Sequence, residues 1–321
     1  MFAVSAVRFC PEDPLSALEL GERAEPIAED GWVVVDVKAA SLNHHDLWSL
    51  RGVGLTLAQL PMTLGGDAAG VDPDGNEVIV HALIGDPDYR GDETLDPKRS
   101  LLSERYHGTF AEQVVVPRRN LVPKPPELSW AEAACLPTAW LTAYRMLFNR
   151  SGLQPGSTVL VQGAGGGVAT ALISLAHAGG MRVWVTSRDA TKRDLALEIG
   201  ADKAFAPGAR LPERVDAVME TVGEATWAHS VKSLKPGGTI VISGATSGPM
   251  PPAELTRVFF LQLSVVGSTM GTRDELERLA RFVVATGLRP RIDSEIPLRQ
   301  AGAGFAKMAA GEVFGKVVFT T

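Results

Sequence analysis

The stretch Val159-Leu-Val-Gln-Gly-Ala-Gly-Gly-Gly-Val-Ala169 decides the fold. It opens as an apolar run bounded by glycines, which is typical of a buried strand in a parallel sheet. A helical pattern follows over residues 168–177, and a second apolar strand follows over 181–186. Strand, glycine turn, helix and strand in this order form the context that a dinucleotide-binding fingerprint requires. The stretch therefore predicts a nucleotide-binding α/β domain.

The glycines of this turn have separate physical purposes. Gly163 lets the chain turn sharply off the strand, and Gly165, Gly166 and Gly167 let the backbone approach a pyrophosphate. The helix beyond them, with Val168 in its first turn, offers free N–H groups and a positive dipole end to that anion. We expect these five residues to bind the cofactor.

The composition limits the class of protein. The chain has 321 residues, of which 45% are hydrophobic and 21% charged, which indicates about two folded domains. A net charge of −6 and scattered basic residues argue against a nucleic-acid partner. Cys10 and Cys135 are the only cysteines, too few for a disulfide framework or a four-cysteine zinc site.

The chain also lacks the patterns of membrane and secreted proteins. It opens as an alternating strand without a charged signal region, and no run of 18 apolar residues occurs. We therefore expect a cytoplasmic protein with no membrane partner.

The order of elements changes near the middle of the chain. Residues 1–120 are rich in predicted strands, and residues 85–108 form a polar surface loop. From residue 157, strands and helices alternate, which favours a doubly wound parallel sheet covered on both faces. Its predicted strands are 158–162, 181–186, 203–206, 215–220, 238–243 and 263–267.

Several short motifs follow one another along the chain. They are Ala40-Ser-Leu-Asn-His-His-Asp46, Leu64-Gly-Gly-Asp-Ala-Ala-Gly70, Gly108-Thr-Phe-Ala-Glu112, Leu141-Thr-Ala-Tyr144, Leu234-Lys-Pro-Gly-Gly238 and Gly315-Lys-Val-Val318. With the glycine turn, they make the chain resemble the medium-chain dehydrogenase/reductase superfamily, and most of all its zinc-free quinone oxidoreductase branch. The resemblance implies a split, β-rich GroES-like catalytic domain over 1–122 and 273–321. A Rossmann NADP-binding domain, the doubly wound parallel sheet, would then span 123–272.

The resemblance also bears on metal binding. Zinc-dependent relatives use a cysteine, a His-Glu pair and a second cysteine or acid, whereas this chain has Asn43, Gly66-Asp67 and Thr138 there. Glycine has no side chain, and neutral Asn and Thr are poor zinc ligands. We therefore expect no metal.

One alternative metal site uses His44, His45 and Asp67. Adjacent histidines on an extended segment point in different directions, which argues against it.

The end of the second strand predicts the cofactor. NAD-binding domains of this kind carry Asp or Glu there, whereas this chain has Thr186, Ser187 and Arg188, with Lys192 about one helical turn later. Hydroxyl donors and cations suit a 2′-phosphate, so we expect NADPH. Asp189 complicates this interpretation because it could pair with Arg188 or contact a ribose.

Further cofactor contacts are expected from residues at the carboxyl ends of the later strands. These are Val222, Gly223, Ser243, Gly244, Ser268 and Met270. By resemblance, Thr142 would meet the nicotinamide amide, and Lys316 would reach the cofactor from the catalytic domain.

Without zinc, hydrogen-bond donors must polarise the substrate carbonyl. Asn43 is the neutral donor at the matching family position, and His44 and His45 are candidate acids. Asp46 orients its neighbours. Trp48 suits a flat apolar substrate by stacking. Tyrosines that related reductases carry in this segment are absent, which weakens an enoyl-thioester reductase assignment.

The sequence thus predicts an NADPH-dependent oxidoreductase that transfers hydride to a quinone or α,β-unsaturated carbonyl without metal. A zinc alcohol dehydrogenase with unusual ligands and a weakly catalytic NADPH-binding sensor are the alternatives. The apolar strand over 261–267 would be a sheet edge, so we also expect a homodimer.

Overall fold

The computed structural model describes residues 1–321, which form two compact units. Unit 1 comprises residues 1–139 and 271–321, and unit 2 comprises residues 140–270. Residues 123–139, which we expected in the nucleotide domain, belong to unit 1. The reason is that helix α2 (Trp130–Ala134) packs on strands β3 (Trp32–Ser41) and β5 (Asp67–Val71).

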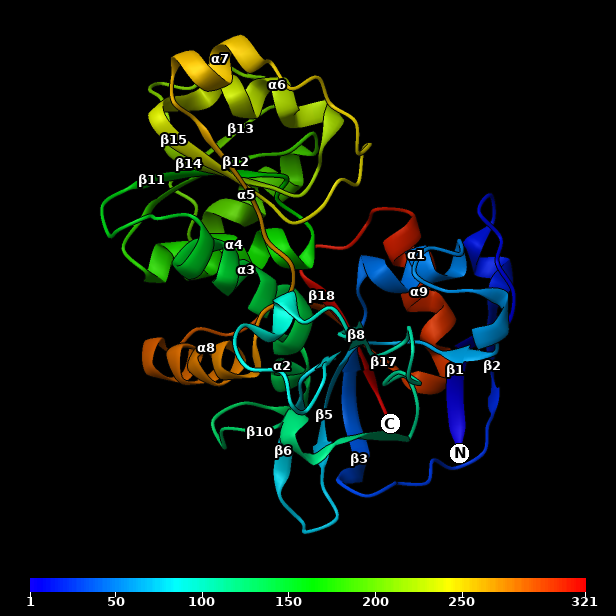
Figure 1. The fold of residues 1–321 in the computed structure, drawn as a ribbon. Coiled ribbons are helices and arrows are strands. Elements are labelled where there is room, and N and C mark those ends of the chain that lie inside the picture. The colour runs from blue at the N-terminus through cyan, green and yellow to red at the C-terminus, as the bar shows by residue number, and fades with distance from the viewer. The chain divides into compact units, whose positions relative to one another are not determined.

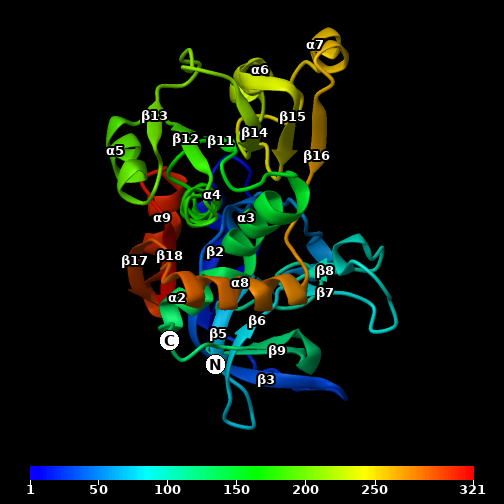
Figure 2. The ribbon, with the colours of Figure 1, turned by 90° about the vertical axis from the view of Figure 1, so that its left-hand side faces the viewer.

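Unit 2 is built on a six-stranded parallel sheet in the order β13-β12-β11-β14-β15-β16, visible from left to right in Figure 2. Its strands are β11 (Thr158–Gln162), β12 (Arg182–Thr186), β13 (Lys203–Phe205), β14 (Val215–Glu220), β15 (Leu234–Ile242) and β16 (Ser264–Gly267). The predicted doubly wound parallel sheet is confirmed, with β15 beginning before the predicted residue 238.

Helices cover both faces of this sheet. Figure 1 shows α6 and α7 on one face and α3 and α4 on the other. The helices of unit 2 are α3 (Leu141–Arg145), α4 (Gly167–Ala178), α5 (Ala190–Glu198), α6 (Glu224–Ser233) and α7 (Leu255–Phe260). Strand β11 is buried along its whole length, because its apolar residues face helices on both sides.

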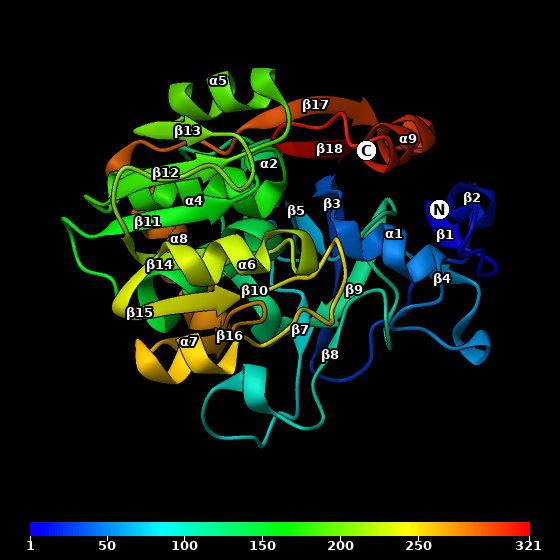
Figure 3. The ribbon, with the colours of Figure 1, turned by 90° about the horizontal axis from the view of Figure 1, so that it is seen from above.

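Unit 1 contains a sheet in which segments far apart in sequence meet. Strand β3 pairs antiparallel with β5, with β9 (Gln113–Pro117) and with β18 (Lys316–Thr320). Strand β18 also pairs with β17 (Ile292–Pro297), so the C-terminal strands complete the sheet that β3 begins (Figure 3). The predicted GroES-like, β-rich domain with a returning C-terminal segment is confirmed.

The remaining strands and helices complete unit 1. The remaining strands are β1 (Phe2–Ala6), β2 (Leu18–Glu22), β4 (Met62–Thr63), β6 (Glu77–Val80), β7 (Leu83–Ile84), β8 (Ser100–Leu101) and β10 (Leu121–Pro123). The remaining helices are α1 (His44–Leu50), α8 (Arg273–Thr286) and α9 (Ala301–Ala309).

None of these helices has the length and apolar character needed to cross a membrane.

Candidate functional site

Helix α1 begins directly after β3, and its first turn is fixed by a buried carboxylate. Asp46 Oδ2 accepts from the Asn43 backbone N–H at 2.8 Å, and Asp46 Oδ1 accepts from Gly65 N–H at 3.0 Å. Burial raises the pKa of Asp46 to about 6, against the opposing effects of His45 and the Asn43 N–H. Asp46 thus ties the start of α1 to the Gly65 turn.

A buried ion pair lies beside this helix start. Lys316 Nζ lies 3.2 Å from Asp67 Oδ2, and both side chains are almost inaccessible to solvent. Asp67 Oδ2 also accepts from Ser41 Oγ at 2.7 Å and from Asn43 Nδ2 at 2.8 Å. We call Ser41, Asn43, Asp67 and Lys316 the Lys316 cluster.

The hydrogen bonds of the cluster revise two predicted roles. Lys316 Nζ donates to Leu42 O at 2.8 Å and Asn43 Oδ1 at 2.6 Å as well as to Asp67, so its three hydrogens are all used. We therefore no longer assign Lys316 to the cofactor. Asn43 Nδ2 donates to Asp67 and to Ser41 O at 3.3 Å, which leaves no amide hydrogen for a substrate carbonyl.

The structure brings together the positions at which zinc-dependent relatives carry ligands. Asn43 and Asp67 are hydrogen-bonded, and Thr138 Oγ1 lies 3.5 Å from where a Cβ on Gly66 would stand. The donors at these positions are an amide, a hydroxyl and a carboxylate that already pairs with an ammonium. No group of three or more His, Cys, Asp or Glu side chains is placed to hold a metal ion. This donor set does not fit zinc.

The two adjacent histidines of α1 have different surroundings. His45 Nε2 lies 3.1 Å from Glu104 Oε1, and this contact, with the nearby carboxylates, raises the pKa of His45 although burial opposes it. His44 is exposed, yet neighbouring protein removes part of its hydration and the Lys316 charge lies within range, so its pKa is lowered. Burial and the Lys316 charge thus both favour the neutral form of His44. Trp48 is half-buried one turn further along α1.

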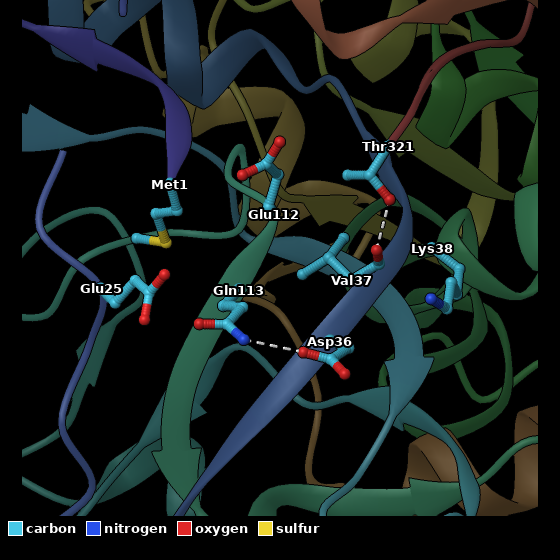
Figure 4. Close-up of a pocket in the computed structure, with 8 residues that line it drawn as sticks. All are labelled: Met1, Glu25, Asp36, Val37, Lys38, Glu112, Gln113 and Thr321. Atoms are coloured by element: carbon cyan, nitrogen blue, oxygen red, sulfur yellow. Dashed lines mark hydrogen bonds between the residues drawn. The ribbon is translucent and has the colours of Figure 1, made fainter. Parts of the chain in front are cut away.

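A separate pocket in unit 1 lies along the middle of β3 and has a volume of about 330 Å³. Figure 4 shows its lining side chains, which include Asp36, Lys38 and Glu112. No residue that we predicted for catalysis or cofactor binding lines it, so it is not the candidate site.

The glycine turn of unit 2 has the conformation that the fingerprint requires. Gly163 follows β11 with φ +85°, a region that favours glycine. Gly166 caps α4, whose first residues are Gly167 and Val168, and a Cβ on Gly166 would meet no atom within 4 Å. The turn thus leaves open space before the first N–H groups of α4, as a bound pyrophosphate needs.

The residues between β12 and α5 include one acid, Asp189, whose side chain caps that helix. Asp189 is the N-cap of α5 and accepts from Lys192 N–H at 3.2 Å, so its carboxylate is used within the helix start. The side chain of Lys192 lies against Gly165, with Nζ 3.1 Å from where a Cβ would stand. Ser187 and Arg188 follow the strand with no acid before the N-cap. These features suit a 2′-phosphate.

The other predicted cofactor residues follow neighbouring strands of one parallel sheet, at the edge where the carboxyl ends of its strands meet. Val222 and Gly223 follow β14, Ser243 and Gly244 follow β15, and Ser268 follows β16. Met270 lies two residues beyond Ser268 and is buried. Thr142 lies on α3 instead, where it is buried.

Comparison with known families identifies both units. Residues 29–126 match the model of the alcohol dehydrogenase GroES-like domain, and residues 167–285 match that of the zinc-binding dehydrogenases. A solved structure described as an NAD-dependent alcohol dehydrogenase is 34% identical, with a TM-score of 0.92 over the whole of both chains.

The chain belongs to the medium-chain dehydrogenase/reductase superfamily.

Curated members with similar sequences include two kinds of thioester enzyme. The acryloyl-coenzyme A reductase of Metallosphaera sedula is 28% identical over 94% of this chain and 96% of its own. The crotonyl-CoA carboxylase/reductase of Cereibacter sphaeroides is 26% identical over 96% of this chain and 84% of its own. The superfamily assignment makes the chain an oxidoreductase.

Proposed function

We propose that this member of the superfamily is an NADPH-dependent reductase of quinones or α,β-unsaturated carbonyls that works without a metal, as in the zinc-free branch. The observation that carries the proposal is the Lys316 cluster together with Thr138. The positions that hold zinc in metal-dependent relatives present an amide, a hydroxyl and a carboxylate bonded to an ammonium. The names of the acryloyl- and crotonyl-CoA reductases support a substrate with a conjugated C=C bond.

The assignment of NADPH rests on the residues after β12. Ser187, Arg188 and Lys192 offer a hydroxyl and two cations, and Asp189 is engaged as a helix cap. The alcohol dehydrogenase structure described above is named for NAD, so the cofactor preference is a direct test of this assignment.

The catalytic assignments follow from the hydrogen bonds of unit 1. NADPH, when bound, supplies the hydride. We assign to neutral His44 the hydrogen bond that polarises the substrate carbonyl, because the amide hydrogens of Asn43 are already used. Asn43 and Asp46 are positioning residues that hold the first turn of α1. Trp48 stacks on a flat substrate.

The experiment that tests the proposal is a turnover assay on metal-analysed protein. Loss of NADPH absorbance is followed with a panel of quinones, enones and enoyl thioesters, and the same sample is tested with simple alcohols and NAD or NADP. Turnover of an enone or quinone by zinc-free protein is the expected result. Alcohol oxidation by protein with one zinc per chain would establish the second candidate, an alcohol dehydrogenase, which the 34% identical structure favours.

We also propose that the chain forms a homodimer through the edge of the unit 2 sheet. Strand β16 is the last strand of that sheet, and Val265 on it is 47% exposed. Phe259 and Phe260 of α7 are exposed as well, so the area offers apolar surface for a second copy. A monomeric mass in light scattering would refute this. The cytoplasmic location stays a prediction from the sequence.

A further inference from the structure

Three neighbouring strands of unit 2 each end in a buried polar residue. Thr186 ends β12, Gln162 ends β11 and Glu220 ends β14, and all three are almost inaccessible to solvent. In a parallel sheet, adjacent strands that end together bring their last side chains into contact. Thr186 Oγ1 donates to Gln162 Oε1 at 2.6 Å, and Gln162 Nε2 donates to Ser230 Oγ of α6 at 2.9 Å.

The chain of hydrogen bonds has a single direction and ends at Glu220. Ser230 Oγ donates to Glu220 Oε2 at 2.6 Å. Thr226 Oγ1 donates to Glu220 Oε1 at 2.9 Å. The backbone N–H groups of Val222 and Gly223 donate to the same oxygen at 2.8 and 3.1 Å. Each hydrogen bond to the Glu220 side chain runs from a hydroxyl or a backbone N–H to a carboxyl oxygen, which is the pattern that a carboxylate acceptor satisfies.

The second hydrogen on Gln162 Nε2 fixes the amide. It is donated to His229 Nδ1 at 3.0 Å, while His229 Nε2 donates to Ala209 O at 2.9 Å. Both hydrogens of the amide are thereby used, and Oε1 of Gln162 must face Thr186. The network therefore cannot reverse without leaving a buried polar atom unpaired.

No cation pairs with Glu220, although burial of a carboxylate is costly. Backbone N–H groups and hydroxyls alone compensate the charge. Two of these donors belong to the Val222–Gly223 loop, so the carboxylate fixes the course of that loop. Gly223 adds to this, because its φ is +92° and a Cβ there would collide with Gly248 O.

The loop lies at the point where a dinucleotide crosses this sheet. Strands β11 and β14 are adjacent, and the chain winds outward from them in opposite directions, so the crevice between their carboxyl ends is the topological switch point. Val222 Cγ2 lies 3.6 Å from where a Cβ on Gly163 would stand. The adenosine half belongs to the β12 side of the crevice, and the nicotinamide half to the β14 side.

We propose that Glu220 is a positioning residue for the nicotinamide half of NADPH. Its carboxylate holds the Val222–Gly223 loop, and Gln162 and Ser230 fix the carboxylate relative to the end of β12. The inference rests on the proposed NADPH binding. It predicts that loss of the Glu220 charge weakens contacts to the nicotinamide half and spares those to the adenosine half.

The test compares two ligands on the full chain by calorimetric titration. NADPH spans both halves, whereas 2′,5′-ADP carries only the adenosine half with its 2′-phosphate. Glu220→Gln has the same shape but brings a donor group where only acceptors fit. We expect the Kd for NADPH to rise about tenfold, the range of a lost charge-assisted hydrogen bond, and the Kd for 2′,5′-ADP to change less than twofold.

Two further variants make the result decisive. Glu198→Gln removes an exposed carboxylate of the same unit and should change neither Kd. Ser230→Ala leaves the charge in place but cuts its link to Gln162, and should show the same selectivity with a smaller rise. Equal weakening of both ligands, or no weakening of NADPH, would overturn the inference. Failure of the unaltered protein to bind either ligand would instead overturn the proposed cofactor.

Discussion

Lys316→Met removes the cation of a buried ion pair and keeps most of the volume of the side chain. In the folded protein this change leaves the Asp67 carboxylate fully buried, with hydrogen bonds only from Ser41 and Asn43. Removal of one partner of a buried pair costs about 3–5 kcal/mol, because the other charge stays uncompensated. We expect the free energy of unfolding to fall by that amount.

The double variant Asp67→Asn/Lys316→Met separates charge from packing. It removes both charges together, so no uncompensated ion remains, and we expect its stability to lie within about 1 kcal/mol of the unaltered protein. Lys98→Met is the matched control for an exposed pair. Lys98 Nζ lies 2.6 Å from Asp86, but its side chain is 73% exposed, so we expect no measurable loss.

Urea unfolding at neutral pH, followed by circular dichroism, measures all three variants under the same conditions. If Lys316→Met is no less stable than Lys98→Met, the Lys316 charge does not stabilise the buried Asp67 carboxylate. If the double variant is as unstable as Lys316→Met, the loss comes from packing around the methylenes of Lys316 and not from the charge of Asp67.

Four further predictions test single groups. His44→Ala should lower kcat about 100-fold and leave the Kd for NADPH unchanged. His45→Ala should mainly reduce stability, because it removes the contact between His45 and Glu104. The pKa of Asp46 is about 6 in the folded protein, above its usual 3.8, so folding favours the protonated carboxyl. This preference contributes about 3 kcal/mol to the free energy of unfolding. The contribution is complete below pH 4 and is lost as the pH rises through 6. Urea unfolding of Asp46→Asn should lack this fall, and an equal slope in both proteins would contradict the pKa. Arg188→Ala should raise the Kd for NADPH about tenfold and not that for NADH, and equal effects on both would remove Arg188 from the phosphate site. Burial raises the pKa of Cys135 to about 12, so mass spectrometry after iodoacetamide treatment of the native protein should find Cys135 unmodified, in contrast to the half-buried Cys10.

The architecture of unit 2 was predictable because its signals are local. The alternation of apolar strands with helices, and the glycine turn after residue 162, specify the sheet from neighbouring residues alone. The predicted strand 215–220 matches β14 (Val215–Glu220) without error. The family resemblance supplied what local signals could not, namely the return of the C-terminal strand to unit 1.

The hydrogen bonds of the site depend on contacts between distant residues, which the sequence does not reveal. Asp67 was considered only as a metal-ligand position, because its partner Lys316 lies 249 residues away. The network of Gln162, Ser230 and Glu220 was missed for the same reason. A possible signal was present, since polar residues at the ends of strands that are otherwise apolar are expected to have buried partners.

The pairing of β18 with β3 has a consequence for the biogenesis of the protein. Residues 140–270 are contiguous, so a growing chain can complete unit 2 before the ribosome reaches residue 316. Unit 1 must wait, since Val318, Phe319 and Thr320 pair with β3, near the start of the sequence. Until then residues 39–41 of β3, which β9 does not cover, have an unpaired edge that invites pairing with other chains. A premature stop codon before Lys316 therefore yields a protein in which unit 2 folds and unit 1 stays incomplete and prone to aggregation. We expect quality-control proteases to remove this protein.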